Sequence, residues 1–201
     1  MKIMKIKAII LSMTIMLTLS GCDVLNQMAQ MATFSKCEFK TTTVENLTLG
    51  GVNVQNTKSL SDINFLTIGG MLKSIAMGKM PLEFTINLEA KNPNATLAAM
   101  NKIEWIVIID STELTRGIIN ERIEIQPNGT TPIPIHIESD ILEIAKGKAG
   151  KSVLNLGLNL AGVDGTPSSR LTIKIKPTIM VGSFPMDYPG YITVKKDFGS
   201  N

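Results

Sequence analysis

The stretch LEFTINLEAKN (residues 82–92) decides the fold class. Its apolar side chains alternate with polar ones: Leu82, Phe84, Ile86, Leu88 and Ala90. Successive side chains of a β-strand point to opposite faces of the sheet. The alternation therefore predicts a strand with one buried face and one solvated face.

The next apolar stretch, KIEWIVIID (residues 102–110), is apolar on both sides. One face carries Ile103, Trp105, Val107 and Ile109, and the other face carries Ile106 and Ile108. A strand that is apolar on both faces is typical of the interior of a covered sheet. We predict a central strand here.

The rest of the chain contains more short apolar runs of the same kind. The sequence QPNGT (residues 126–130) contains proline, asparagine and glycine in turn order, so we predict a hairpin that joins residues 117–125 to residues 131–137. Alternating leucines at residues 154–160 predict another strand. Two further runs, at residues 171–175 and 191–194, complete the set.

Two helices are expected to interrupt the strands. The first follows Ser59 and spans residues 60–78. Ser59 and Asp62 have the spacing of a capping box, although Gly69 and Gly70 weaken the helix. Its apolar stripe is Ile68, Met71, Leu72, Ile75 and Ala76. The second helix is short and spans residues 141–148. Many short strands and one or two short helices predict a mainly β protein, an antiparallel β-sandwich.

The first 21 residues have the composition of a secretory signal. Lys2, Lys5 and Lys7 precede an apolar run at residues 8–19, which ends in small residues. A transmembrane helix needs about 20 apolar residues, so this run is short for a permanent span. We expect an export signal at residues 1–21.

The end of this segment, Leu19-Ser20-Gly21-Cys22, resembles the lipobox of bacterial lipoproteins. The resemblance implies that the Cys22 thiol carries a diacylglycerol and that the signal is removed before it. It also implies acylation, such as palmitate, at the new terminus. The protein would then be attached to a membrane of the bacterial cell envelope, inner or outer. The alternative is an ordinary signal peptide with an unrelated cysteine near its cleavage site.

Residues 22–33 would form the lipidated tether between the membrane and a sandwich domain at residues 34–201. Val24, Leu25, Met28, Met31 and Ala32 have helical spacing. A short helix on the membrane surface and a loose linker are both compatible with this segment. A fully extended linker of this length would span at most roughly 40 Å.

Composition excludes several classes of partner and chemistry. Without the three signal lysines, the 20 basic residues become 17 and equal the 17 acidic residues, so no nucleic-acid partner is expected. If Cys22 carries lipid, Cys37 has no partner for an intrachain disulfide. We expect Cys37 to be a buried free thiol, and the alternative is a reactive thiol with Lys36 beside it.

The sequence contains few residues suited to catalysis. His136 is the only histidine, and the strand pattern places it on the solvated face, where a catalytic pair with Cys37 would lack an orienting group. The segment AKGKAGKS (residues 145–152) matches a relaxed phosphate loop, but we interpret the alternating leucines after it as a strand, so an exposed basic turn is favoured. We expect no enzyme, no cofactor and no metal site.

An ordered set of motifs resembles the late embryogenesis abundant type-2 family, also called the WHy (water-stress and hypersensitive-response) domain. The set consists of Asn92-Pro93-Asn94, the Trp105 strand, Leu114 with Gly117, and Pro127-Asn128-Gly129. The resemblance covers residues 80–180 and implies a fibronectin/immunoglobulin-like sandwich. Ser111 departs from the glycine common in that family's turn. Asn92, Pro93, Asn94 and Gly117 are expected to be structural, with Pro93 ending the strand and the asparagines bonding to their own backbone.

Residues 34–79 would add a strand pair and a helix in front of this domain. The resemblance implies a non-catalytic envelope module for protein or lipid interaction, or for stress protection, as in desiccation. The alternative function is a carrier of lipid or another small apolar ligand, in a pocket between the sheets or under the 60–78 helix. Met71, Met77 and Met80 would then line the pocket. Ser111 also fits a short O-glycosylation pattern.

Overall fold

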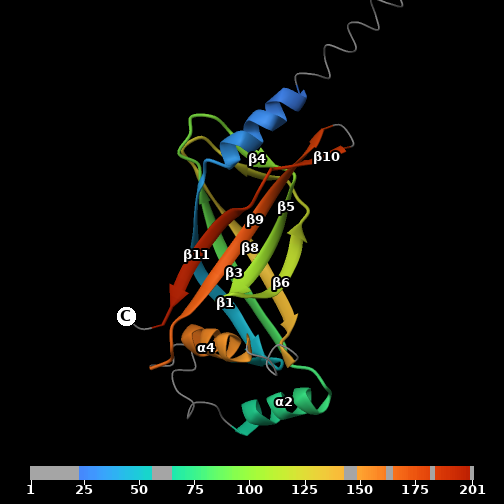
Figure 1. Ribbon diagram of the computed structural model, residues 1–201, viewed down its shortest axis with the longest axis vertical. Helices are drawn as coiled ribbons and strands as arrows, with labels where there is room; N and C mark the ends of the chain where they lie inside the picture. The colour runs from blue at the N-terminus through green and yellow to red at the C-terminus, as the bar shows by residue number, and fades with distance from the viewer. Residues whose placement is uncertain (1–22, 56–64, 143–148, 162–164, 182–183, 200–201) are drawn as a thin grey trace, which may run out of the picture.

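The computed structural model describes residues 23–55, 65–142, 149–161, 165–181 and 184–199, and it is an elongated β-sandwich with helices at both ends (Figure 1). Residues 23–34 are helical. The labelled elements, in chain order, are β1 (Glu38–Leu49), β2 (Val52–Asn53), α2 (Phe65–Ala76), β3 (Pro81–Lys91), β4 (Ala98–Met100), β5 (Lys102–Ile109), β6 (Thr112–Ile119), β7 (Ile123–Ile125), β8 (Thr130–Asp140), α4 (Ala149–Ala161), β9 (Ser169–Val181), β10 (Phe184–Asp187) and β11 (Ile192–Phe198).

Two antiparallel sheets form the layers of the sandwich. One has the strand order β2-β1-β3-β8, and the other has the order β10-β9-β5-β6 with β11 also paired to β9. A small third sheet, β4-β7, lies at one end. The predicted fold class, a mainly β antiparallel sandwich with short helices, is confirmed. The predicted strand pair in front of β3 is also observed as β1 and β2, which are joined by a Gly50-Gly51 turn.

The two strands that define the fold follow their predicted patterns. In β3, every apolar side chain of residues 82–90 is buried, and β8 places Ile137, Ile135 and Ile133 opposite Phe84, Ile86 and Leu88. β5 lies between β9 and β6, so it is an interior strand as predicted. Its outer face is only half covered, because Ile106 and Ile108 are partly exposed.

The core fills the space between the two sheets. Its members are aliphatic and aromatic side chains from both inner faces: Phe84, Ile86, Leu88, Ile103, Trp105, Val107, Ile109, Ile133, Ile135, Leu171, Ile173 and Ile175. Each is at most a few per cent exposed, apart from Trp105 at 7%. Burial of this apolar area is the main contribution that stabilises the fold.

The predicted hairpin between residues 117–125 and 131–137 is wrong in its pairing. The turn itself exists, since Asn128 has a φ of 57° and the Gly129 amide donates to the Gln126 carbonyl at 2.9 Å. However, β7 pairs with β4, and β8 pairs with β3. The chain therefore passes at this turn from the small β4-β7 sheet to the sheet that contains β3 and β8. Local turn chemistry identifies the turn but leaves the partners of the flanking strands to tertiary packing.

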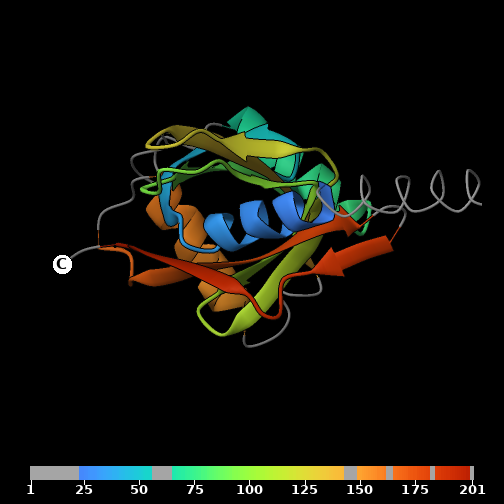
Figure 2. The same cartoon turned by 90° about the horizontal axis from the view of Figure 1, so that it is seen from above.

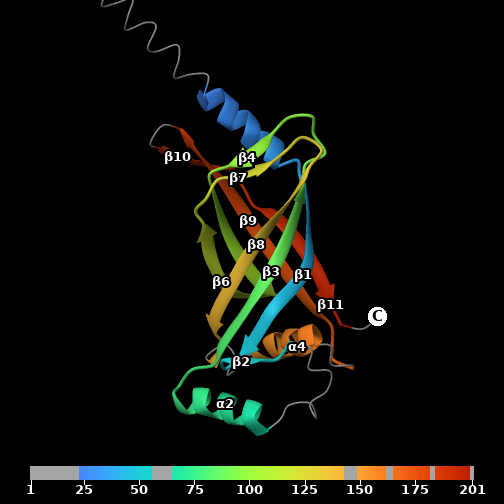
Figure 3. The same cartoon turned by 180° about the vertical axis from the view of Figure 1, so that it is seen from behind.

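The predicted strand at residues 154–160 is also wrong, because these residues belong to helix α4. The helix buries Val153 and Leu156 and half-buries Leu160, which is the spacing of one helical face. The alternating leucines contain this second periodicity, and leucine favours helices. Helix α4 covers one end of the sandwich, and α2 lies at the same end (Figure 3).

The first predicted helix is confirmed over Phe65–Ala76, although its proposed cap, Ser59 and Asp62, lies outside the described residues. Of its predicted apolar stripe, the side chains that the structure describes, Leu72, Ile75 and Ala76, are exposed and lie outside the core. The second predicted helix lies mostly outside the described residues, which resume with α4 after Leu142.

Candidate functional site

The helix at residues 23–34 lies across one end of the sandwich, between the two sheets (Figures 1 and 2). We call this end, with β4, β7 and β10, the amino-terminal end. Met31 and Phe34 are buried there, and the Phe34 ring lies 5.1 Å from that of Phe39. Polar contacts add to this packing: Arg122 donates to Gln30 at 2.9 Å, and Thr33 lies 3.2 Å from the Thr96 hydroxyl. The segment is therefore a helix and not a loose linker, and its position on a membrane surface stays a prediction.

Asn92 connects three separate parts of the amino-terminal end. The side chain is fully buried, and its amide donates to the carbonyls of Thr96 at 2.8 Å and Ile125 at 3.0 Å, with a longer contact to Gln126 at 3.3 Å. The backbone amide of Asn92 also donates to the Gly129 carbonyl at 2.9 Å. The end of β3 is thereby joined to the following loop and to the β7–β8 turn.

The local part of this arrangement is the one that the sequence indicates. The side-chain oxygen of Asn92 accepts from the backbone amide of Asn94 at 3.0 Å and from its side-chain amide at 2.9 Å. Such a bond to a backbone two residues on is an Asx turn. Pro93, with no amide hydrogen, is the second residue after the end of β3. The long-range bonds from Asn92 to β7 could not be inferred from the sequence, because they depend on the strand arrangement.

Gly117 provides space for the only tryptophan. It pairs with Trp105 across β5 and β6, and the indole lies over the glycine. A Cβ atom at position 117 would approach Cε2 and Cη2 of the indole to 2.7 and 2.9 Å. Real Cβ contacts are essentially never this short, so a side chain here would displace the tryptophan. Gly117 is thus needed for its small size.

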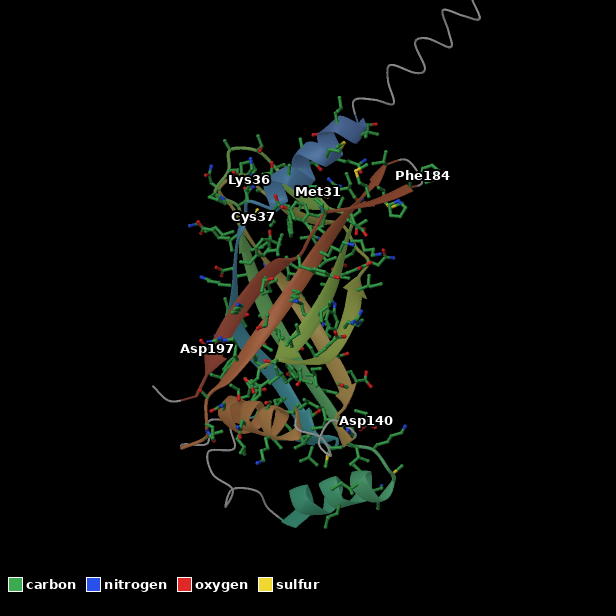
Figure 4. All side chains as sticks on the ribbon, in the orientation of Figure 1. Met31, Lys36, Cys37, Asp140, Phe184 and Asp197 are labelled. Atoms are coloured by element: carbon green, nitrogen blue, oxygen red, sulfur yellow. The ribbon has the colours of Figure 1, made fainter. Side chains whose placement is uncertain are left out.

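Cys37 lies just before β1 and is buried (Figure 4). Its thiol donates to the Thr33 carbonyl at 3.6 Å. Burial raises the pKa of the Cys37 thiol from 9.0 to about 11. Because the thiolate is the reactive form, this environment favours the unreactive thiol over the reactive alternative.

We expect Cys37 to react slowly with thiol reagents in the folded protein. A rise of two pKa units lowers the thiolate fraction about 100-fold at neutral pH, before burial is considered. The measurement is the labelling rate of a Cys22→Ser protein at pH 7.5, with and without denaturant. Equal rates in the two conditions would show that Cys37 is exposed and would contradict its assigned burial.

The structure does not bring Cys37 and His136 together. The His136 side chain is exposed, and its Nδ1 atom lies 3.0 Å from the Thr85 hydroxyl. The register places the start of β1 level with Thr130 at the start of β8, and His136 is six residues further along. At 3.3 Å per residue, the separation along the strand is about 20 Å. The sequence prediction that His136 lies on the solvated strand face is confirmed.

The glycine-lysine-serine motif has a different context from the one expected. Residues 150–152 form the first turn of α4, so a helix follows the motif and not a strand. The predicted strand after this motif, on which the choice of an exposed basic turn rested, is therefore wrong. Lys151 is exposed, and residues 145–148 of the motif lie outside the described residues.

Two of the three methionines suggested for a ligand pocket are described. Met77 is 69% exposed beyond the end of α2, and Met80 is half-buried before β3. The side chain of Met71 is not among those described. Ser111 is exposed in the β5–β6 turn, where the left-handed conformation falls on Asp110, with a φ of 53°. The turn therefore does not need glycine at position 111.

The described part of the chain contains neither a metal-ligand cluster nor a membrane-spanning helix. No group of three or more histidine, cysteine, aspartate and glutamate side chains in this part of the chain is arranged to hold a metal ion. No helix within the described ranges has both the length and the hydropathy required to cross a membrane.

The fold defines the class of protein as a mainly β, antiparallel sandwich. No protein-family model matches the chain, and no curated protein matches it significantly. Among solved structures, it is similar to a protein from Archaeoglobus fulgidus (12% identity, TM-score 0.35, covering 60% of this chain and 86% of that one) and to a protein from Arabidopsis thaliana (14%, 0.37, 59% and 70%). A third similar structure is described as a putative late embryogenesis abundant protein (12%, 0.33, 94% and 83%).

Proposed function

We propose that this chain is a non-catalytic envelope lipoprotein whose sandwich is an interaction or stress-protection module at a membrane surface. One observation supports it most directly. The helix, which the structure describes from Asp23, the residue next to Cys22 in the sequence, is packed onto the sandwich through Met31 and Phe34. A lipid on Cys22 would therefore hold the sandwich by a defined end.

The helix also limits the distance between the membrane and the sandwich. Twelve helical residues span about 18 Å, which is less than half the reach of an extended linker of this length. Because the helix is docked along the end of the sandwich (Figure 2), the domain would lie close to the lipid headgroups. Two or three acyl chains on Cys22 would hold it there stably, since each buried methylene contributes about 0.8 kcal/mol.

The properties of the sandwich support a binding or protective module over a catalyst. The two side chains most suited to nucleophilic chemistry lie far apart, Cys37 just before β1 and His136 within β8, and burial raises the pKa of the thiol. The remainder of the proposal, protection of the membrane during water loss, comes from the motif resemblance at residues 92–129.

The experiment compares the lipidated protein, a matched Cys37→Ser variant and a Cys22→Ser variant that is produced without residues 1–21, so that no apolar signal remains. Each is mixed with dye-loaded phosphatidylcholine vesicles that are then dried and rehydrated. We expect the parent and the Cys37→Ser protein to float with the vesicles and to reduce dye leakage. The Cys22→Ser protein should stay mainly in the soluble fraction and leave leakage unchanged.

Two outcomes separate the parts of this proposal. Flotation of the Cys22→Ser protein equal to that of the parent would contradict the lipid anchor. Flotation of the parent without any reduction in leakage would contradict membrane protection and leave an anchored interaction module.

A further inference from the structure

The helix at residues 23–34 has an apolar face that the sandwich does not cover. Val24, Gln27, Met31 and Phe34 form the face that packs on the domain. A second stripe has the spacing i, i+3, i+4, i+7 and is exposed along its whole length: Leu25, Met28, Ala29 and Ala32. Leu25 is 69% exposed and Met28 is 41% exposed. Exposed leucine and methionine on one side of a docked helix are unfavourable in water.

β10 exposes two more large apolar side chains at the same end. Phe184 pairs with Val181 and Met186 pairs with Ile179, which is buried. Directly paired residues point to the same face of a sheet, so Phe184 and Met186 lie on its core-facing side. They are nevertheless 77% and 38% exposed, because β10 extends beyond the end of the core.

The helix and β10 lie together at the amino-terminal end in every view (Figures 1, 2 and 3). Figure 4 shows the labelled Phe184 at the level of Met31 and far from Asp140. We call Leu25, Met28, Phe184 and Met186 the apolar rim. The rim is formed by segments that are about 160 residues apart in the sequence and that the fold brings to one end.

Two ion pairs lie at this end of the sandwich. Asp187 accepts from Lys176 at 2.9 Å and from the Thr178 hydroxyl at 2.7 Å, and the bond from Lys176 is the main cause that lowers the pKa of Asp187. Arg122 pairs with Glu124 at 2.7 Å. Asp23, two residues before Leu25, is exposed. The four side chains of the apolar rim are themselves uncharged, so the rim favours an apolar environment.

We propose that the apolar rim is a membrane-contact surface that enters the interfacial layer of the bilayer beside the lipid on Cys22. The occupant is specified by the chain itself. Residue 22 adjoins Asp23, the first described residue of the helix, and the apolar run at residues 8–19 is the expected export signal on which the proposed membrane attachment rests. The inference rests on the proposed function, since the lipid supplies the initial attachment.

The geometry turns a single attachment point into an oriented contact. One lipidated residue alone would let the sandwich rotate about its tether. Leu25 and Met28 lie three and six residues after Cys22, and Phe184 and Met186 add a contact from β10. Contact by both segments orients the sandwich so that its long axis points away from the bilayer. The end with α2 and α4 then faces the surroundings (Figure 1).

The test places a fluorophore on each end of the lipidated protein in a Cys37→Ser background. Pro185→Cys reports on β10, and Lys73→Cys on α2 reports on the opposite end. Both positions are exposed. The protein is reconstituted in neutral phosphatidylcholine vesicles. We expect a lipid-borne quencher to act several-fold more strongly on position 185 and iodide in the water to act several-fold more strongly on position 73.

A matched pair of variants assigns the effect to the apolar rim. Leu25→Ser/Met28→Ser/Phe184→Ser should abolish the lipid quenching at position 185 while the protein still floats with the vesicles. Leu72→Ser/Ile75→Ser/Met77→Ser changes equally exposed side chains of the α2 region and should leave that quenching unchanged. All six side chains are exposed, so both variants are expected to fold.

Three results would overturn the contact and are distinguishable from one another. Floating protein in which iodide reaches positions 185 and 73 equally would overturn the contact and leave the anchor intact. Position 185 shielded from iodide but not quenched by lipid would show a protein partner or a second copy on this surface. Protein that does not float, with an unmodified Cys22 peptide by mass spectrometry, would overturn the anchor together with the contact.

Discussion

Replacement of Asn92 by alanine is expected to lower the free energy of unfolding by about 3 kcal/mol or more. The fully buried amide donates to backbone carbonyls of the next loop and of β7, and each buried carbonyl left without a partner costs about 1–3 kcal/mol. The local turn also loses the acceptor for the Asn94 amide. The measurement is urea unfolding of the mature domain, followed by the emission of Trp105.

Asn92→Asp tests the same donor with nearly unchanged shape. An aspartate would place a carboxylate against carbonyl oxygens, so its pKa in the folded state would be raised above the unfolded value. The variant should therefore be least destabilised at low pH and should lose stability as the pH rises through that raised pKa. Asn94→Ala is the control, and it should cost less than about 1.5 kcal/mol because Asn94 is only part-buried. Equal losses for Asn92→Ala and Asn94→Ala would contradict the assigned role of Asn92.

Replacement of Gly117 by alanine is expected to cost about 3 kcal/mol, at the upper end of the range for overpacking. The new methyl group would overlap the six-membered ring of Trp105, which is packed within the core and cannot shift freely. Displacement of the indole should also shift the emission of the native protein toward longer wavelengths, because Trp105 is the only tryptophan. Unfolding curves and native emission spectra are the measurements.

Gly157→Ala is the matched control for Gly117→Ala. Gly157 lies inside helix α4 with open space where its Cβ would be, so alanine there should raise stability by about 0.5–1 kcal/mol. An unchanged native emission and an unchanged midpoint for Gly117→Ala would show that the indole does not depend on this glycine.

The strands were predictable where a single periodicity dominates the sequence. The alternation at residues 82–90 has only one arrangement that buries its apolar side chains, and the structure adopts it. The same holds for Leu171, Ile173 and Ile175 in β9. Alternation failed as a guide at residues 154–160. Val153, Leu156 and Leu160 also have the spacing of one helical face, and packing of that face against the end of the sandwich selected the helix.

The amino-terminal end was less predictable, because its contacts join distant segments. Helical spacing at residues 24–32 indicated the helix, but no local signal showed that Met31 and Phe34 would be buried while Leu25 stays exposed. The asparagine of the Asn-Pro-Asn motif suggested a turn, whereas its bond to Ile125 depends on the position of β7. Residues 184–187 carry no pattern that distinguishes an exposed strand from a loop.

The proposed function depends on a lipid on Cys22 that attaches the sandwich to a membrane. Intact-mass and native mass spectrometry of the protein, extracted gently from its own envelope, test it most directly, alongside the Cys22→Ser form. We predict a chain that begins at Cys22 and carries two or three acyl groups, and an anchor-free domain without a bound ligand. An unmodified Cys22, or a chain that retains residues 1–21, would contradict the anchor, and a lipid retained noncovalently by the Cys22→Ser form would support the carrier alternative in its place.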